Sequence, residues 1–458
     1  MHKGIDTKGL AEPDLLKMLD SLEPGGSIAC VPFVDDKNIY FGASDSYIYS
    51  IDKKLASVNW KFRCRGIVGI SSPVIFNGIL YTGSLDGYCY ALDPKDGRLI
   101  WEFRTSGKIL NTPRLFDNKL FISSTDGNLY CLENTSGKLL WQKHLGSLAV
   151  VLSSIVNGNV FVGSWVERNY QCISPEGKVL WKVNIDHWPD EAAFATPDGE
   201  FLSNGCTFVN AVDVDEFVFI IPSWSSRLYL CDDKGKILWK ESIESSLVVP
   251  TIEKGNIYAG SLNGNIYSLS LKDASQNWKY TTGDTVISNT PVIHNGVAYT
   301  GSCDGNIYAL NPEDGRLIWR FQTAGPVISP AVFSGNIMYI GSWDAHLYAF
   351  DISDPKSPRL LWKFATGIPP SAPKFINWIG DFEKFKEKYL NLQWKPETFS
   401  ALQEQGKKSP YAGPAGIGDE AAFSRSAYAG FRGAEAYQKQ DSPYAGKRGD
   451  KKKDAYSR

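Results

Sequence analysis

Short runs of apolar and aromatic residues, separated by turn residues, recur along most of this chain. One unit contains four of them in order: TPVIH (290–294), VAYTGS (297–302), NIYALN (306–311) and RLIWRF (316–321). Asn-Gly and Asp-Gly pairs lie between these runs, and such pairs favour the tight turns that join antiparallel strands. The pattern therefore predicts a unit of four short β-strands connected by hairpins.

A tryptophan in the fourth run of each unit shows how often the unit repeats. The spacing is about 40 residues, apart from one longer interval between Trp181 and Trp239. Four antiparallel strands at this period predict an all-β protein, an eight-bladed β-propeller, since a β-helix would need far shorter repeats. The eight tryptophans are Trp60, Trp101, Trp141, Trp181, Trp239, Trp278, Trp319 and Trp362.

The end of each unit also carries a longer motif. YALDPKDGRLIWEFRTSG (90–107) and YALNPEDGRLIWRFQTAG (308–325) are nearly identical, and YAFDISDPKSPRLLWKFATG (348–367) matches them with a short insertion. These passages resemble the repeat of the propellers named after pyrroloquinoline quinone (PQQ) enzymes, over roughly residues 27 to 378. The resemblance implies that the eight tryptophans dock between adjacent blades and fasten the ring. It is specific for the fold but less so for function, because the family contains both dehydrogenases and scaffolds.

The cysteines give little support to quinone or metal chemistry. The PQQ dehydrogenases that the repeat resembles use a vicinal disulfide over the cofactor, and the eight cysteines of this chain include no Cys-Cys pair. Cys131 and Cys172 align with alanines of other third strands, so we expect them to fill small core positions. No zinc-type spacing and no HExxH, GxSxG or P-loop motif occurs. We therefore predict no catalytic residues, no metal site, no cofactor and no enzymatic activity.

The turn between the second and third strands contains the clearest binding signal on the predicted propeller. Aspartates in this turn are expected to make local backbone hydrogen bonds rather than to act as acids. Blades four, five and eight add a tryptophan there, in GSWVERN, PSWSSRL and GSWDAHL. Tryptophan and arginine dominate binding hot spots, and the alternative is that each indole packs against the neighbouring blade. The candidate binding residues are Trp165, Arg168, Trp224, Arg227, Trp343 and His346, and the turn aspartates are Asp86, Asp126, Asp304 and Asp344.

The longer interval between blades four and five provides a second candidate. Residues 184–206 span the additional length and contain His187 and Trp188 next to acidic residues. Long loops on a repeat scaffold often carry function. If this loop lies on the same face as the three tryptophan-containing turns, it belongs to one recognition surface; decoration of the scaffold is the alternative.

The two ends of the chain depart from the repeat. Residues 1–26 include a predicted short amphipathic helix before the propeller at 27–378, and residues 379–394 form a second predicted helix with an apolar stripe. Residues 395–458 are rich in Gly, Ala, Ser, Lys and Gln and poor in aliphatic residues. Such a composition cannot bury enough apolar area to offset its chain entropy, so this tail is predicted to be disordered.

The predicted tail nevertheless contains a repeated motif. SPYAG occurs twice and SAYAG occurs once. Aromatic anchors placed at intervals on a flexible chain favour multivalent docking, so Tyr411, Tyr428 and Tyr444 are candidate contacts for a protein partner. The alternative is that the repeats arose by drift in a low-complexity sequence and bind no partner.

Charge and hydropathy narrow the predicted function. The formal net charge of −2 gives no reason to expect nucleic-acid or membrane binding. No apolar run has the length of a secretory signal or a membrane span, so we expect a cytoplasmic protein. We predict a non-catalytic protein–protein interaction scaffold: the propeller face binds a protein or peptide, and the tail docks onto a second partner, for which a multimeric assembly is one option. A quinone- or metal-dependent oxidoreductase and a sensor of a sugar or nucleotide stay open as alternatives.

Overall fold

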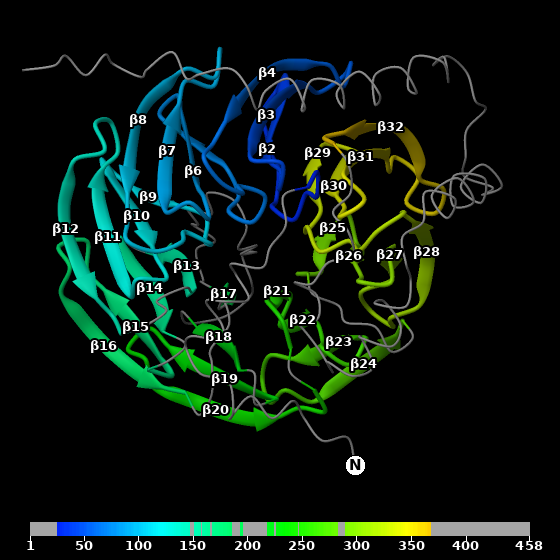
Figure 1. Cartoon of the computed structure of the whole chain (residues 1–458). Helices are drawn as coiled ribbons and strands as arrows, with labels where there is room; N and C mark the ends of the chain where they lie inside the picture. The colour runs from blue at the N-terminus through cyan, green and yellow to red at the C-terminus, as the bar shows by residue number, and fades with distance from the viewer. Residues whose placement is uncertain are drawn as a thin grey trace, which may run out of the picture. The chain divides into compact units, whose positions relative to one another are not determined.

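The computed structural model contains eight four-stranded antiparallel sheets arranged around a central axis (Figure 1). Each sheet is built from four strands that are consecutive in sequence, and no α-helix occurs among the described residues. The all-β, eight-bladed propeller predicted from the sequence is confirmed. The predicted terminal helices and the tail lie outside the described residues, which are 25–146, 151–156, 158–164, 167–185, 193–195, 218–223, 226–245, 247–282 and 289–367.

The blades follow chain order. Blades one to four comprise β1 (Phe33–Val34), β2 (Asn38–Gly42), β3 (Tyr47–Asp52), β4 (Val58–Arg63), β5 (Val74–Phe76), β6 (Ile79–Gly83), β7 (Tyr88–Leu92), β8 (Leu99–Arg104), β9 (Arg114–Phe116), β10 (Lys119–Ser123), β11 (Asn128–Glu133), β12 (Leu139–His144), β13 (Val151–Val156), β14 (Asn159–Ser164), β15 (Asn169–Ile173) and β16 (Val179–Asn184). Blades five to eight comprise β17 (Ala193–Ala195), β18 (Val218–Ser223), β19 (Arg227–Asp232), β20 (Ile237–Ser242), β21 (Thr251–Glu253), β22 (Asn256–Gly260), β23 (Asn265–Ser270), β24 (Gln276–Thr281), β25 (Val292–His294), β26 (Val297–Gly301), β27 (Asn306–Leu310), β28 (Leu317–Gln322), β29 (Val332–Ser334), β30 (Ile337–Gly341), β31 (His346–Asp351) and β32 (Arg359–Ala365).

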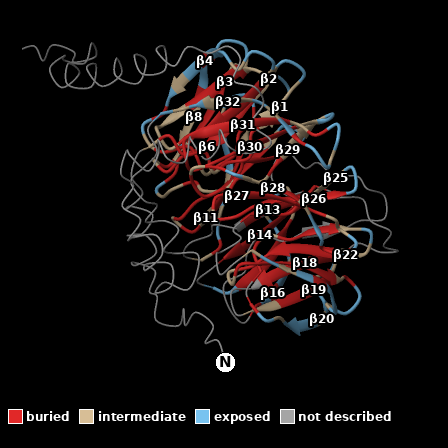
Figure 2. Cartoon of the chain, turned by 90° about the vertical axis from the view of Figure 1, so that its right-hand side faces the viewer, coloured by how far each residue is buried: buried red, intermediate tan, exposed pale blue. Residues whose placement is uncertain are grey.

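Burial explains the different patterns of the strands. Every residue of β26 and β27 is buried, because each sheet packs between two neighbouring sheets and both faces of its middle strands are covered. The outer strand β32 alternates between exposed and half-buried residues, as expected for a strand with one face toward solvent. Buried residues accordingly fill the interior of the blades, and exposed residues follow the turns and the outer strands (Figure 2).

The hydrophobic core lies between the blades. Val74, Tyr81 and Cys89 of blade two pack with Leu115 and Leu120 of blade three, and comparable clusters join other neighbouring blades. Because the side chains of each cluster lie between two adjacent sheets, the core consists of separate layers between blades and not of one central cluster. A blade therefore depends on both neighbours for its stability.

The ring closes between blades eight and one, and neither blade contains a strand from the other end of the propeller sequence. The segment before β1 makes this closure: the amide of Ile28 donates to the carbonyl of Ser342 at 3.1 Å. Ser329 Oγ donates to the carbonyl of Cys30 at 2.8 Å. Apolar residues from both blades, including Ile28 and Tyr339, surround these contacts. Closure thus combines a two-sided core with backbone hydrogen bonds from the N-terminal segment.

The location of the longer interval differs from the sequence analysis. Residues 193–195 form β17, the innermost strand of blade five, and the next strand begins only at Val218. The additional length therefore lies inside blade five, between its first and second strands, and not between blades four and five. The sequence did not reveal this strand because three small or apolar residues carry no alternation and no flanking hairpin turn.

Candidate functional site

Tryptophans of the outer strands lie at the junctions between blades. Trp60 Nε1 donates to the carbonyl of Pro94 in blade two at 2.9 Å. Equivalent hydrogen bonds of 2.7 to 3.1 Å join the next five consecutive junctions; their donors are Trp101, Trp141, Trp181, Trp239 and Trp278. Trp319 and Trp362 pack within the cores between blades seven and eight and between blades eight and one. Trp319 Nε1 is buried and has no hydrogen-bond partner among the described residues.

Glycine in the following blade provides the space for the indole. Gly97 has a φ of +73°, and a Cβ placed there would lie 2.5 Å from Cε3 of Trp60. Gly137 and Gly315 show the same arrangement with Trp101 and Trp278. At these three positions the glycine before the outer strand is therefore needed for two reasons, its left-handed backbone and its missing side chain.

The turn aspartates hold the turn together and join neighbouring strands. Asp86 accepts a hydrogen bond from the amide of Tyr88 at 2.7 Å and another from the Tyr90 hydroxyl at 2.8 Å. Asp126 makes the same pair of contacts and also accepts from the amide of Ser106 in the preceding blade at 2.9 Å. The aspartates at this position that make the amide and tyrosine contacts are Asp45, Asp86, Asp126, Asp304 and Asp344.

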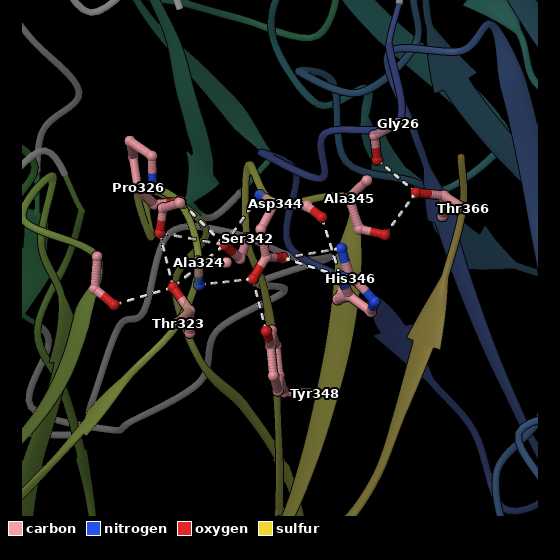
Figure 3. A network of polar contacts seen from close by, with 12 residues as sticks. Gly26, Thr323, Ala324, Pro326, Ser342, Asp344, Ala345, His346, Tyr348 and Thr366 are labelled. Carbon is pink, nitrogen blue, oxygen red and sulfur yellow. Dashed lines mark hydrogen bonds and ion pairs between the residues drawn. The ribbon is translucent and has the colours of Figure 1, made fainter. Parts of the chain in front are cut away.

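Blade eight contains the most enclosed of these turns (Figure 3). Asp344 is fully buried and accepts hydrogen bonds from the Tyr348 hydroxyl at 2.5 Å and from the amide of Ala324 at 3.0 Å. His346 Nδ1 lies 3.3 Å from the Asp344 carboxylate. Burial alone would raise the pKa of Asp344, but the contacts with His346, Tyr348 and Ala324 together hold this pKa below its ordinary value.

Trp343 and His346 do not form an exposed pair. Their side chains are only 8% and 5% exposed, respectively, which differs from the recognition surface that the sequence predicts for this turn. The segment before blade one covers the turn: the backbone of Gly26 lies against Ala345, and Thr366 donates to the carbonyl groups of both residues. The Trp343 indole is therefore largely buried.

The other candidate residues divide between two locations. Arg168 is exposed and has a φ of +50°, and Arg227 is half-buried. Their blades, four and five, are neighbours, whereas blade eight is adjacent to neither of them (Figure 1). The remaining candidates lie outside the described residues: Trp165, Trp224, His187, Trp188, Tyr411, Tyr428 and Tyr444.

A set of polar contacts joins neighbouring blades where their first strands begin, and it was not identified from the sequence. Ser72 Oγ accepts a hydrogen bond from the amide of Val31 in the preceding blade at 2.9 Å. Thr251 Oγ1 donates to the carbonyl of Pro291 at 2.6 Å, and the Asn289 amide group donates to the carbonyl of Ser329 at 3.1 Å. The recurring Ser-Ser-Pro and Asn-Thr-Pro triplets before first strands are the signal that could have revealed them.

The cysteines occupy the core. The seven that lie in the described part of the chain are buried and free of disulfides. Burial raises the pKa of the Cys131 thiol to about 12, which keeps it protonated and unreactive at neutral pH. Within the described ranges, no group of three or more His, Cys, Asp and Glu residues has the arrangement of a metal site. No helix that could cross a membrane occurs in the same ranges.

Asp45 gives a first test of this framework. Burial of its carboxyl raises its pKa to about 6, against the opposing effect of hydrogen bonds from Tyr49 and the amide of Tyr47. A raised folded-state pKa means that the folded protein binds the proton more tightly, so the free energy of unfolding falls as pH rises from about 4 to 6. In the Asp45→Asn variant, the fall in the free energy of unfolding over this pH range is expected to be smaller than in wild type by about 2–3 kcal/mol. Urea unfolding at several pH values across the range measures this difference.

A matched variant separates this ionisation from the lost hydrogen bonds. Asp126→Asn makes the same change from carboxylate to amide at the equivalent turn of blade three, where Asp126 accepts the corresponding hydrogen bonds. Identical pH slopes for wild type and Asp45→Asn would contradict the assignment of the slope to the Asp45 carboxyl.

The blades, the turns and the indole junctions define a PQQ-like β-propeller. The family described as outer membrane protein assembly factor BamB matches residues 44–165, 166–291 and 283–376 of this chain. The chain therefore belongs to this PQQ-like propeller family. A fold of this family is consistent with a protein-interaction scaffold.

Solved structures with the same fold include a designed protein and a natural one. The computationally designed protein Ika8 has 15% identity and a TM-score of 0.58, over 70% of this chain and 95% of that chain. BamB from Moraxella catarrhalis has 16% identity and a TM-score of 0.54, over 69% of this chain and 91% of that chain. At such low identity these neighbours show the fold alone. No curated protein matches the sequence.

Proposed function

We propose that this chain is a cytoplasmic, non-catalytic scaffold that holds one protein partner on its propeller and a second partner through its C-terminal tail. The observation that carries the proposal is membership of a family whose description names a protein assembly factor. Such a role requires recognition surfaces and no reaction chemistry.

The distribution of reactive side chains supports the same proposal. The turn aspartates are engaged with tyrosine hydroxyls and backbone amides, and the cysteines in the described blades are enclosed in the core. A side chain engaged in this way maintains the ring and is not available to a substrate. Exposed arginine and lysine side chains on turns and outer strands are available for recognition, and Arg168 is one of them.

The tail contribution can be tested in the full-length protein. Replacing Tyr411, Tyr428 and Tyr444 together with alanine is expected to reduce recovery of tail-dependent partners by about tenfold or more, because tethered motifs reinforce one another. Quantitative affinity capture from the source cells, with wild type and variant in parallel, measures this recovery. Phenylalanine at the same three positions retains the aromatic rings and is the matched control. Equal recovery with the triple alanine variant would reject the tail as a docking element.

A further inference from the structure

The fourth strand of each blade forms the outer edge of its sheet. In every sheet it stands last and has one neighbouring strand, so among the described residues the other side of its backbone is open. These eight strands together contain ten Lys and Arg and two Asp and Glu, although the whole chain has a net charge of −2. Cations on edge strands commonly prevent unwanted pairing of sheets. The outer strand of blade one, β4, has three further features that are not needed to prevent sheet pairing.

The first of these features is exposed apolar surface next to the cations. Val58, at the start of β4, is 48% exposed, and Leu55, in the preceding turn, is 78% exposed; no other large apolar residue in the described part is as exposed as these two. Lys61 and Arg63 are exposed on the same strand, which contains no acidic residue. Exposed aliphatic side chains beside cations are characteristic of a contact surface.

The second feature is the direction of the β4 backbone. The amide of Cys64 donates to the carbonyl of Ser46 at 2.8 Å, so it points into the sheet. Successive residues of a strand direct their backbone groups to opposite sides, and the pairing of β3 with β4 is regular from Trp60 to Arg63. The N–H and C=O groups of Arg63, and those of Lys61, therefore point outward at the open edge.

The third feature is an arginine and tyrosine cluster next to the end of β4. The guanidinium carbon of Arg65 lies 4.2 Å from the centroid of the Tyr88 ring, and that of Arg104 lies 5.7 Å from the same centroid. Two hydrogen bonds of 2.8 Å to Glu102 hold Arg65 in place. Arg104, like Arg63, has no ion pair with any described residue, so its charge is available to an anionic partner.

These cations lie on both sides of the β4 edge. Phe62 packs against Tyr90 of blade two, with a ring-centroid distance of 5.7 Å. Because side chains alternate along a strand, Lys61 and Arg63 project from the opposite face, where Lys61 Nζ lies 4.7 Å from the Tyr47 ring centroid. A strand added to β4 would alternate its own side chains between two positively charged faces.

We infer that β4 accepts an acidic, extended segment of a partner protein as a fifth strand of blade one. Main-chain pairing with Lys61 and Arg63 supplies affinity, and acidic side chains of the segment select the site by their charge. The tail of this chain does not match the site, because residues 395–458 contain 12 Lys and Arg against 8 Asp and Glu. This inference rests on the proposed scaffold function and specifies the chemistry of one partner.

The test uses the full-length protein and a synthetic probe. A fluorescein-labelled peptide of alternating glutamate and valine, about ten residues long, is titrated with the protein and followed by anisotropy at low salt. Arg63→Glu/Arg104→Glu is expected to weaken binding by about tenfold or more, whereas Lys182→Glu/Arg320→Glu, with the same charge change on the outer strands of blades four and seven, is expected to change it by less than about threefold. Hydrogen exchange at the Lys61 and Arg63 amides should slow on addition of the glutamate peptide, because these outward amides become paired.

Four outcomes would overturn the inference: no binding of the peptide, equal binding of a lysine–valine peptide, equal loss in the two double variants, or binding without protection of the two amides. Tighter binding of an oligothymidylate of similar charge would also overturn it, in favour of a nucleic acid. The scaffold proposal fails separately, since the tyrosine variants test it through a different part of the chain. Failure of the peptide alone leaves the scaffold in place and removes only the β4 site.

Discussion

Gly97→Ala is expected to destabilise the propeller by about 3 kcal/mol or more, although it adds a single methyl group. The φ of Gly97 is +73°, so any side chain there is strained. The new Cβ would also lie 2.5 Å from the Trp60 ring, which is closer than van der Waals contact allows. The indole cannot withdraw without losing its 2.9 Å hydrogen bond to Pro94, and urea unfolding measures the combined effect.

Blade two contains its own control for this prediction. Gly78 has a φ of +75°, but a Cβ placed there would meet no atom within 4 Å. Gly78→Ala should therefore report backbone strain alone, about 1 kcal/mol. In a Trp60→Ala background, the additional effect of Gly97→Ala should fall to the same value, because the clash is gone. An undiminished effect in that background would show that the Trp60 ring is not the cause.

The same junction explains why the fold could be predicted from the sequence. A glycine before the outer strand and a tryptophan of the preceding blade form one contact that recurs at five junctions, so the spacing of these residues follows the repeat directly. Gly97 and Trp60 belong to different blades, yet each is identified by its position within its own unit. The local strand and turn signals predict the same fold as this longer repeat. A fold can be predicted from sequence when local and long-range signals agree in this way.

The sequence did not reveal a β-bulge that recurs in every blade. In all eight sheets the register shifts by one residue between the third and fourth strands, as between Ala91 and Leu92, so Leu99 and Ile100 both remain partly exposed before Trp101 turns inward. Such a bulge depends on pairing and is not encoded by the alternation of one strand.

The candidate site was harder to predict than the fold, and His346 shows why. Its turn has the same sequence pattern as the turns of blades four and five, but the segment before blade one covers it. Contacts between residues about 320 positions apart are set by ring closure, which local sequence does not record. The outward direction of Lys61 and Arg63 was equally hidden, since it follows from the hydrogen bond of Cys64 to the neighbouring strand.

Asp344→Asn is expected to lower the free energy of unfolding by about 2–4 kcal/mol at neutral pH, because a fully buried carboxylate loses its charge-assisted contacts with Tyr348, Ala324 and His346. The folded-state pKa of Asp344 is lowered, so its contribution is present above the unfolded pKa of about 4 and is lost as pH falls through the folded value. The difference between wild type and variant should therefore be constant above about pH 5 and should shrink in more acidic solution, the reverse of the trend expected for Asp45. Tyr348→Phe removes one donor and leaves the carboxylate, so it should cost about 1–1.5 kcal/mol. Urea unfolding of the three proteins against pH measures both effects, and a difference that stayed constant down to acidic pH would mean that the charge of Asp344 does not hold this turn in place.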